Sequence, residues 1–192
     1  MIIVLALGDS LTAGYGLAPE HSFAFRLEQA LRDEGNDVQV INGGVSGDTA
    51  HDGLLRLDGL LKHHPDLVIV EFGANDVYMG LPVDDVRSSL ERIIDRCRET
   101  GAFVFLAGVA SLQDPDEDYS MRFHKAFDEL AKSKGISFLP DFLPGIPGNP
   151  ELTLPDGIHP NESGVDRMVE NILPGLRPLM AQISSQEIRK KN

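Results

Sequence analysis

The chain has 192 residues, of which 42% are hydrophobic and 24% charged, and its formal net charge is −13. A chain of this length fits a single domain that buries a large core without disulfide bonds. The excess of acidic residues argues against binding to nucleic acid, because phosphate backbones are also anionic. Cys97 is the only cysteine, which excludes an internal disulfide and a multi-cysteine zinc site.

No apolar run reaches the roughly 18 residues that span a bilayer, so we expect no stable membrane anchor. The apolar start at Ile2–Leu7 lacks the basic region and the small-residue cleavage site of a signal peptide, which favours a buried strand. We therefore expect a cytoplasmic protein, or a periplasmic or secreted one whose leader is absent from this sequence.

Apolar, β-rich segments alternate with amphipathic helical segments along the chain. The predicted strands are Ile2–Leu7, Val38–Ile41, Leu67–Phe72, Phe103–Val109 and Ile136–Leu139. The predicted helices are Phe23–Glu34, Asp52–His63, Val83–Thr100, Ser120–Lys134 and Asn161–Leu173, with Pro174 and Pro178 expected to break or kink any continuation. Continuous apolar strands are typical of a parallel sheet that is buried on both faces. The pattern predicts one three-layer α/β domain over residues 1–183, with right-handed crossovers, and a polar tail at 184–192.

Four segments rich in glycine and polar residues follow the predicted strands. They are Gly8–Leu11, Gly43–Asp48, Gly73–Asp76 and Asp156–His159. In an open α/β sheet, functional residues lie in the loops beyond the carboxyl ends of the strands. We therefore expect the four segments to meet at one edge of the sheet.

Ser10, His159 and Asp156 are the residue types that acyl transfer requires. A serine hydroxyl is a weak nucleophile and needs an adjacent general base, which His159 can supply. Asp156 lies three residues before the histidine, so it can hold the second imidazole nitrogen and stabilise the imidazolium. We therefore predict that these three residues are catalytic. The alternatives are that Ser10 caps a helix and that Asp156 belongs to a Pro-Asp-Gly turn.

Attack on a carbonyl carbon creates an oxyanion, which preorganised hydrogen-bond donors must stabilise. The candidate donors are the backbone N–H groups of Ser10 and Gly47 and the side-chain amide of Asn75. Glycine at position 47 allows the backbone to approach a substrate closely, because it has no Cβ. Gly43 and Gly44 lie nearby and are competing candidates.

The residues that follow Asn75 are candidates for binding the acyl part of a substrate. They either line an acyl groove or pack against the sheet, and the two interpretations are about equally supported. A second loop, Ala110–Tyr119, is also expected to contribute to acyl selectivity. The candidate residues are Val77, Tyr78, Met79 and Leu81.

No motif points to a metal ion or a nucleotide. The histidines form no H-E-x-x-H pattern, and Gly43–Gly47 does not match G-x-G-x-x-G. Asp9 and Asp76 are expected to hold their loops by hydrogen bonds. Cys97 lies on the apolar face of its predicted helix, where packing is the expected role.

The same four segments resemble the signature blocks of the SGNH hydrolase superfamily, the GDSL esterases and lipases. GDSLTAGYG (Gly8–Gly16) is similar to the first block, SGDT (Ser46–Thr49) to the second, GAND (Gly73–Asp76) to the third and DGIHP (Asp156–Pro160) to the last. Their order and spacing match over nearly the whole chain. The resemblance implies that Ser10 is the nucleophile, that Asp156 and His159 complete a triad, and that Ser10, Gly47 and Asn75 form the oxyanion hole.

Within this superfamily, the chain looks closest to the bacterial arylesterase, acyl-CoA thioesterase and lysophospholipase subgroup. It departs from that subgroup at Ala74, where glycine is frequent, and the added methyl group is expected to narrow the pocket beside Asn75. The resemblance implies a flavodoxin-like sheet of five parallel strands in the order 2-1-3-4-5, and hydrolysis without a metal ion or cofactor.

Three functional hypotheses are consistent with these residues. The first is a serine hydrolase that cleaves small-molecule carboxylic esters or thioesters through an acyl-enzyme. The second is a carbohydrate O-acetyl esterase of the same superfamily, which the absence of Trp and the presence of only three Tyr disfavour. The third is a non-catalytic flavodoxin-like binding domain. We expect a monomer or a weak oligomer.

Overall fold

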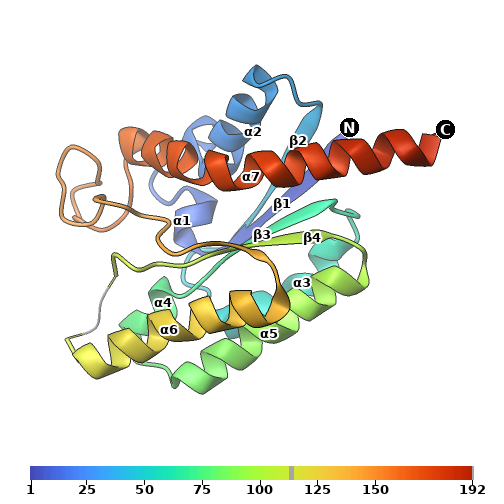
Figure 1. Cartoon of the computed structure of the whole chain (residues 1–192). Helices are drawn as coiled ribbons and strands as arrows, with labels where there is room; N and C mark the ends of the chain where they lie inside the picture. Colours follow the sequence, from blue (N-terminus) through green and yellow to red (C-terminus); the bar gives the residue numbers. More distant parts are fainter. Residues whose placement is uncertain (113–114, 192) are drawn as a thin grey trace.

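The computed structural model describes residues 1–112 and 115–191, with the backbone alone described for 187–191. Within these ranges, five parallel strands form one sheet in the order β2-β1-β3-β4-β5. The strands are β1 (Ile2–Gly8), β2 (Val38–Gly44), β3 (Leu67–Glu71), β4 (Phe103–Ala107) and β5 (Ser137–Leu139). Helices cover both faces of the sheet (Figure 1), so the predicted α/β class and strand order are confirmed.

The long helices form two layers around the sheet. One face is covered by α2 (Phe23–Asp33) and α7 (Glu162–Lys191), and the other by α3 (Ala50–Leu61), α5 (Val83–Glu99) and α6 (Glu117–Lys134) (Figure 1). Two short helices, α1 (Ser10–Ala13) and α4 (Ala74–Tyr78), follow β1 and β3, and a 3-10 turn spans Pro19–His21. The periodicity of the sequence does not predict α1 or α4, because each is shorter than two turns.

Buried strands and capped helices explain why the elements form where the sequence predicts them. Every residue of β3 is buried, and in β1 only Ile3 is partly exposed, as expected for a parallel sheet covered on both faces. The side chain of Ser22 caps α2 by accepting from the N–H of Phe25, and Gly135 ends α6 with a left-handed backbone. Cys97 is fully buried in the core, on α5.

Strand β2 extends to Gly44, three residues beyond the predicted end at Ile41. The register continues until Gly44 lies opposite Gly8 of β1. A Cβ on Gly44 would lie 2.3 Å from the backbone nitrogen of Ala13, so only glycine lets the strand pass α1 this closely. Apart from the end of the last helix, the other predicted boundaries differ from the observed ones by a few residues.

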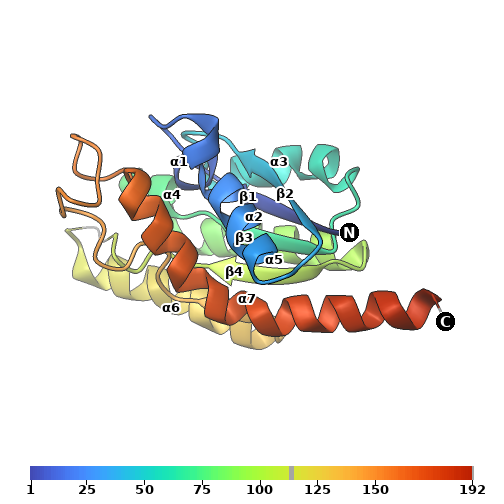
Figure 2. The same cartoon turned by 90° about the horizontal axis from the view of Figure 1, so that it is seen from above.

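Of the two outcomes expected at Pro174 and Pro178, a break or a kink, helix α7 shows the kink. It continues through Pro174 and Pro178 and includes residues 184–191 of the predicted polar tail. Proline removes one backbone hydrogen bond and bends a helix, and α7 bends part-way along its length (Figure 2). The bend is tolerated because side chains on both sides of the prolines remain buried against the core. These are Met168, Ile172, Leu176, Leu179, Met180 and Ile183.

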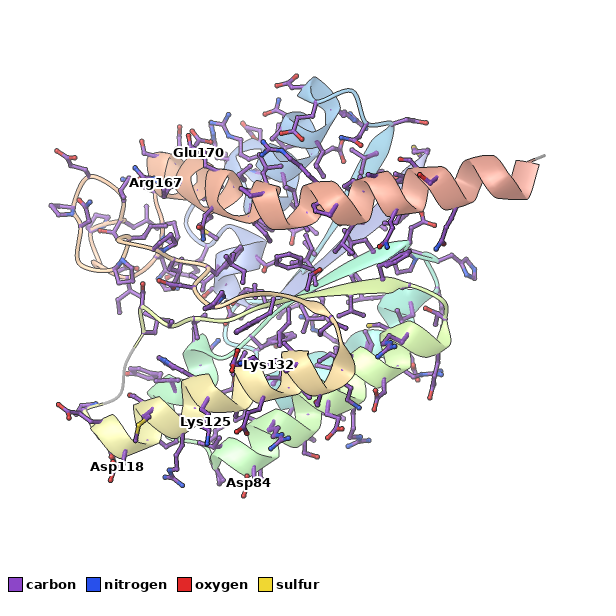
Figure 3. The ribbon with its side chains drawn as sticks, in the orientation of Figure 1. Asp84, Asp118, Lys125, Lys132, Arg167 and Glu170 are labelled. Atoms are coloured by element: carbon purple, nitrogen blue, oxygen red, sulfur yellow. The ribbon has the colours of Figure 1, made fainter. Side chains whose placement is uncertain are left out.

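Charged side chains occupy the outer faces of the helices. Lys125 and Lys132 project from α6 (Figure 3), where they pair with Glu129 and Asp128 one turn away. Such exposed pairs contribute less than about 1 kcal/mol each.

Among the described residues, no helix is both long and apolar enough to cross a membrane. The same residues contain no group of three or more His, Cys, Asp or Glu side chains that could hold a metal ion.

Two glycines on α3 provide a matched test of the packing between helix and sheet. A Cβ on Gly53 would lie 2.2 Å from the ring of Phe72, whereas one on Gly59 would meet nothing within 4 Å. We predict that Gly53→Ala lowers the free energy of unfolding by about 1–3 kcal/mol through overpacking. Gly59→Ala should raise it by roughly 0.5–1 kcal/mol, because alanine is the better helix former. Urea denaturation measures both changes, and equal effects would contradict the described packing.

Candidate active site

The predicted catalytic residues meet at the carboxyl edge of the sheet. Ser10 follows β1, and Asp156 and His159 lie in the long connection that precedes α7. The Nε2 atom of His159 lies 3.0 Å from the Oγ atom of Ser10. The Nδ1 atom of the same ring lies 2.7 Å from Oδ2 of Asp156. The structure therefore brings the three side chains into one continuous chain of hydrogen bonds.

Ser10 is the first residue of α1, and Asp9 rather than Ser10 is the cap of that helix. The Oδ1 atom of Asp9 accepts from the N–H of Leu11 at 2.9 Å. Gly8 must lack a side chain, because its Cβ would lie 2.2 Å from Thr12 Oγ1 and 2.6 Å from Glu71 Oε2. The chain thus passes close to Thr12 and Glu71 at the end of β1, two residues before the hydroxyl that meets His159.

Asp156 organises the turn that carries the imidazole. Its Oδ1 atom accepts from the backbone N–H groups of Ile158 and His159, both at 2.9 Å, while Oδ2 faces the imidazole. The hydrogen bond from Ile158, followed by those from His159, lowers the pKa of the Asp156 carboxyl. The carboxylate thus stays ionised, which favours the tautomer that carries hydrogen on Nδ1 and leaves Nε2 free to accept the Ser10 proton.

An aromatic ring lies against the imidazole of His159. The rings of Tyr15 and His159 have centroids 4.4 Å apart and are tilted by 37°. Tyr15 is 51% exposed, and its backbone N–H donates to the carbonyl of Ser10 at 3.1 Å. Tyr15 therefore packs against the imidazole whose two nitrogens face Asp156 and Ser10.

Two of the predicted oxyanion donors are backbone N–H groups. The N–H of Ser10 lies at the first position of α1, where a helix provides no acceptor of its own. Gly47 has φ +90, a conformation that favours glycine, and a Cβ there would meet nothing within 4 Å. Within the described part of the chain, no acceptor binds the N–H of Gly47.

The third predicted donor, Asn75, already has two acceptors. Its Nδ2 atom donates to the carbonyl of Asp48 at 2.8 Å and to Oδ2 of Asp9 at 3.2 Å. An amide nitrogen carries two hydrogens, so both are engaged in this state. A substrate oxyanion must therefore compete with the longer of the two bonds, the one to Asp9.

Three carboxyl groups near Ser10, those of Asp9, Glu71 and Asp76, are buried. Burial leaves their charged forms poorly solvated. Burial raises the pKa of Asp9 to about 7 against the opposing hydrogen bond from Leu11, and the charges of Asp76 and Asp48 add to the rise. Burial likewise raises the pKa of Asp76 to about 6 and the pKa of Glu71 well above its usual value. All three therefore bind protons more readily than solvated carboxyls. Asp9 and Asp76 also hold their loops, as predicted, because Asp76 accepts from the N–H of Ala50 at 3.2 Å.

The four predicted acyl-binding residues lie on and just after α4 in different environments. Val77 is buried in the core, and Leu81 packs against it. Tyr78 and Met79 are exposed, at 88% and 61%. Val77 and Leu81 therefore attach this segment to the core, whereas Tyr78 and Met79 face solvent. Of the second predicted loop, residues 113–114 lie outside the described residues.

A cavity of about 210 Å³ lies between α6 and the ends of β4 and β5. Val109, Phe123 and Phe127 form part of its wall and lie 3.1–3.2 Å from the position of a Cβ on Gly73. Gly73 is two residues before Asn75, so this wall adjoins the loop that carries the third candidate donor. The cavity is lined by Gly108, Val109, Ala110, Phe123, His124, Phe127, Asp128, Phe138 and Pro140.

Comparison with known protein families identifies the chain. The sequence model of the GDSL-like lipase/acylhydrolase family matches residues 6–167. The chain belongs to this family. The match includes the Ser10, Gly47, Asn75, Asp156 and His159 positions, and it confirms the predicted relationship to the GDSL esterases and lipases.

Similar GDSL proteins cover nearly the whole chain. An arylesterase from Vibrio mimicus is 37% identical over 97% of this chain and 88% of its own length. The Escherichia coli protein named thioesterase 1/protease 1/lysophospholipase L1 is 30% identical over 92% of this chain and 84% of its own. A crystal structure of TesA superimposes with a TM-score of 0.86 at 34% identity, covering 92% of this chain and 99% of the other.

Residues that sequence reasoning did not select also contact the site of this GDSL protein. Glu71 is an acidic residue inside the apolar strand Leu67–Phe72, which is itself a signal of a buried carboxyl group. Tyr15 lies within the GDSLTAGYG motif, but its contact with His159 has no signal in the spacing. Arg56 lies on α3, and its hydrogen bonds to two strand ends have no signal in the helical periodicity.

The raised pKa of Asp9 predicts a dependence of stability on pH. The folded state binds the Asp9 proton more tightly than the unfolded state does, and this adds to the free energy of unfolding. The added stability is complete below the usual pKa of 3.8 and is lost as the pH rises through about 7. Between pH 4.5 and 8, we predict that the free energy of unfolding falls less in Asp9→Asn than in the parent, by on the order of 3 kcal/mol.

Urea denaturation across this pH range measures the slope for each protein. Asp52→Asn is the control, because hydrogen bonds with Thr49 lower the pKa of Asp52, so its contribution is lost toward acid instead. Parallel curves for the parent and Asp9→Asn would contradict the prediction.

Proposed function

We propose that this protein is a serine hydrolase that cleaves small-molecule carboxylic esters or thioesters through an acyl-enzyme. The observation that carries the proposal is the connected geometry of Ser10, His159 and Asp156, with bonds of 3.0 and 2.7 Å. Membership of the GDSL-like lipase/acylhydrolase family supports the same reaction class. The names of the relatives, an arylesterase and a thioesterase/lysophospholipase, agree with ester and thioester substrates.

In the acylation step, Ser10 Oγ attacks the carbonyl carbon while His159 Nε2 removes the hydroxyl proton. Asp156 stabilises the imidazolium that forms, because its carboxylate is hydrogen-bonded to Nδ1. The negative charge on the former carbonyl oxygen is stabilised by the N–H groups of Ser10 and Gly47 and by the Asn75 amide. The bond to the leaving group then breaks, and His159 returns its proton to the departing oxygen or sulfur.

Deacylation repeats the same steps with water as the nucleophile. His159 removes a proton from water, the resulting hydroxide attacks the acyl carbon, and a second oxyanion forms in the same place. When this intermediate collapses, Ser10 regains its proton from His159 and the carboxylic acid is released. The reaction consumes one ester and one water, and each proton that His159 accepts is returned.

The acyl chain is proposed to extend from Ser10 past α4 toward the cavity beside α6. The exposed side chains of Tyr78 and Met79 would contact the substrate between Ser10 and the cavity. Val77 and Leu81 would hold α4 against the core. The aromatic walls of the cavity, Phe123 and Phe127, suit an apolar chain. Its volume of about 210 Å³ suits a short to medium acyl group better than a long one.

Replacing the nucleophile tests the proposed function directly. We predict that Ser10→Ala lowers kcat for p-nitrophenyl acetate by roughly 10⁴-fold or more, with the fold retained. A fluorophosphonate probe should label the parent protein and not the variant. Ser133→Ala is the control, because this serine on α6 donates to a backbone carbonyl instead. Hydrolysis by Ser10→Ala at the parent rate would exclude Ser10 as the nucleophile.

Filling the cavity tests the proposed path of the acyl chain. Ala110 lines the cavity and is partly exposed, so a larger side chain can be accommodated there without overpacking the core. We predict that Ala110→Phe lowers kcat/KM for p-nitrophenyl octanoate by about 10-fold or more, since the chain loses apolar contacts. The same variant should hydrolyse p-nitrophenyl acetate within about twofold of the parent. Equal losses for both esters would show that the chain binds elsewhere.

A further inference from the structure

The guanidinium of Arg56 lies where strands β1 and β2 end, beneath the proposed active site. Its Nη2 atom donates to the carbonyl of Gly8 at 2.9 Å and its Nη1 atom to the carbonyl of Gly43 at 2.7 Å. Its Nε atom donates to Oδ2 of Asp48 at 2.6 Å. The donors of a guanidinium point in fixed directions, so this one side chain joins two strand ends to a third segment.

Each segment that binds Arg56 leads directly to a proposed oxyanion donor. Gly8 is two residues before Ser10, and Asp48 immediately follows Gly47. The carbonyl of Asp48 also accepts from the amide of Asn75 at 2.8 Å. The Arg56 guanidinium is therefore connected to all three proposed donors, to Ser10 through Gly8 and to Gly47 and Asn75 through Asp48.

The segment that most needs this support is the oxyanion loop, which we define as residues 45–48. Residues 45–47 are exposed, so packing does not hold them in place. Two backbone bonds restrain the loop, from Val45 to Gly8 and from Asp48 to Val45. The ion pair of Asp48 with Arg56 attaches the loop to α3, and its carboxylate is 14% exposed. With the bond from the Asn75 amide to the Asp48 carbonyl, these few contacts hold Gly47 at φ +90.

We propose that Arg56 is a positioning residue that aligns the oxyanion loop with Ser10 for ester hydrolysis. The guanidinium also neutralises Asp48, whose carboxylate would otherwise repel the negative charge that develops in the transition state. This inference rests on the proposed function of the same site. Arg56 acts through Gly8, Gly43 and Asp48 and does not itself touch the substrate.

The test compares Arg56→Met with Arg96→Met, which loses an exposed arginine paired with Asp58 and Glu99. For p-nitrophenyl acetate, Arg56→Met should lower kcat by about 10- to 100-fold and leave KM within about threefold, because the loss falls on the transition state. Arg56→Lys should retain part of the activity, and Arg96→Met should keep the parent kcat. Urea denaturation determines the fraction of each variant that is folded at the assay temperature.

A double-mutant cycle with Asp48→Ala tests whether Arg56 acts through the oxyanion loop. If it does, the double variant should be no slower than the slower single variant within about threefold. Independent losses that multiply would overturn the proposal, and so would a parent-like kcat in folded Arg56→Met. A rise in KM at constant kcat would assign Arg56 to substrate binding and would also overturn it.

The design separates this inference from the proposed function. If Ser10→Ala abolishes hydrolysis while Arg56→Met leaves kcat unchanged, the serine mechanism stands and the positioning role fails. If Arg56→Met does not fold, Arg56→Lys and Asp48→Ala provide the same comparison, since each preserves part of the hydrogen-bond network. Parent-like kcat in both of these variants would overturn the proposal.

Discussion

A hydrogen bond of 3.0 Å joins Ser10 to His159, two residues 149 positions apart in the chain. The nucleophile is fixed by β1, the second strand of the sheet order, at a turn that admits no side chain on Gly8. The imidazole is fixed by a turn whose backbone N–H groups bind the Asp156 carboxylate. Asn161 then begins α7 by accepting from the N–H of Gly164 at 3.0 Å. The alignment of these two distant turns thus depends on local hydrogen bonds at each end.

The buried carboxyl groups show that the active-site edge is not built for stability alone. Asp9 and Glu71 are fully buried, and burial raises the pKa of both groups. A carboxyl group held in a poorly solvating environment destabilises the fold at neutral pH unless other bonds compensate. Glu71 accepts from Thr12 Oγ1 at 2.8 Å, and Asp9 accepts from Leu11 and Asn75. The same bonds that offset the cost hold the turn around Ser10.

Much of the fold follows from local sequence patterns, because continuous apolar strands such as Leu67–Phe72 form only when both faces are covered. The meeting of Ser10 with His159 could also be predicted, since parallel strands place their following loops at one edge. The sequence could not decide whether Pro174 and Pro178 break or only kink the last helix, because the outcome depends on tertiary burial on both sides of the prolines. The contacts of Arg56 and Tyr15 depend on three-dimensional distances that have no periodic signal in the chain.

The double engagement of the Asn75 amide has a consequence for the energetics of catalysis. A donor that begins the reaction bonded to protein contributes only the difference between its old acceptor and its new one. When the Asn75 amide exchanges its bond to Asp9 for one to the oxyanion, the gain in free energy is largest if Asp9 carries a proton. The reason is that a neutral carboxyl is a weaker acceptor than a carboxylate. The ionisation of a residue that never meets the substrate thereby sets how much this amide adds to the lowering of the barrier.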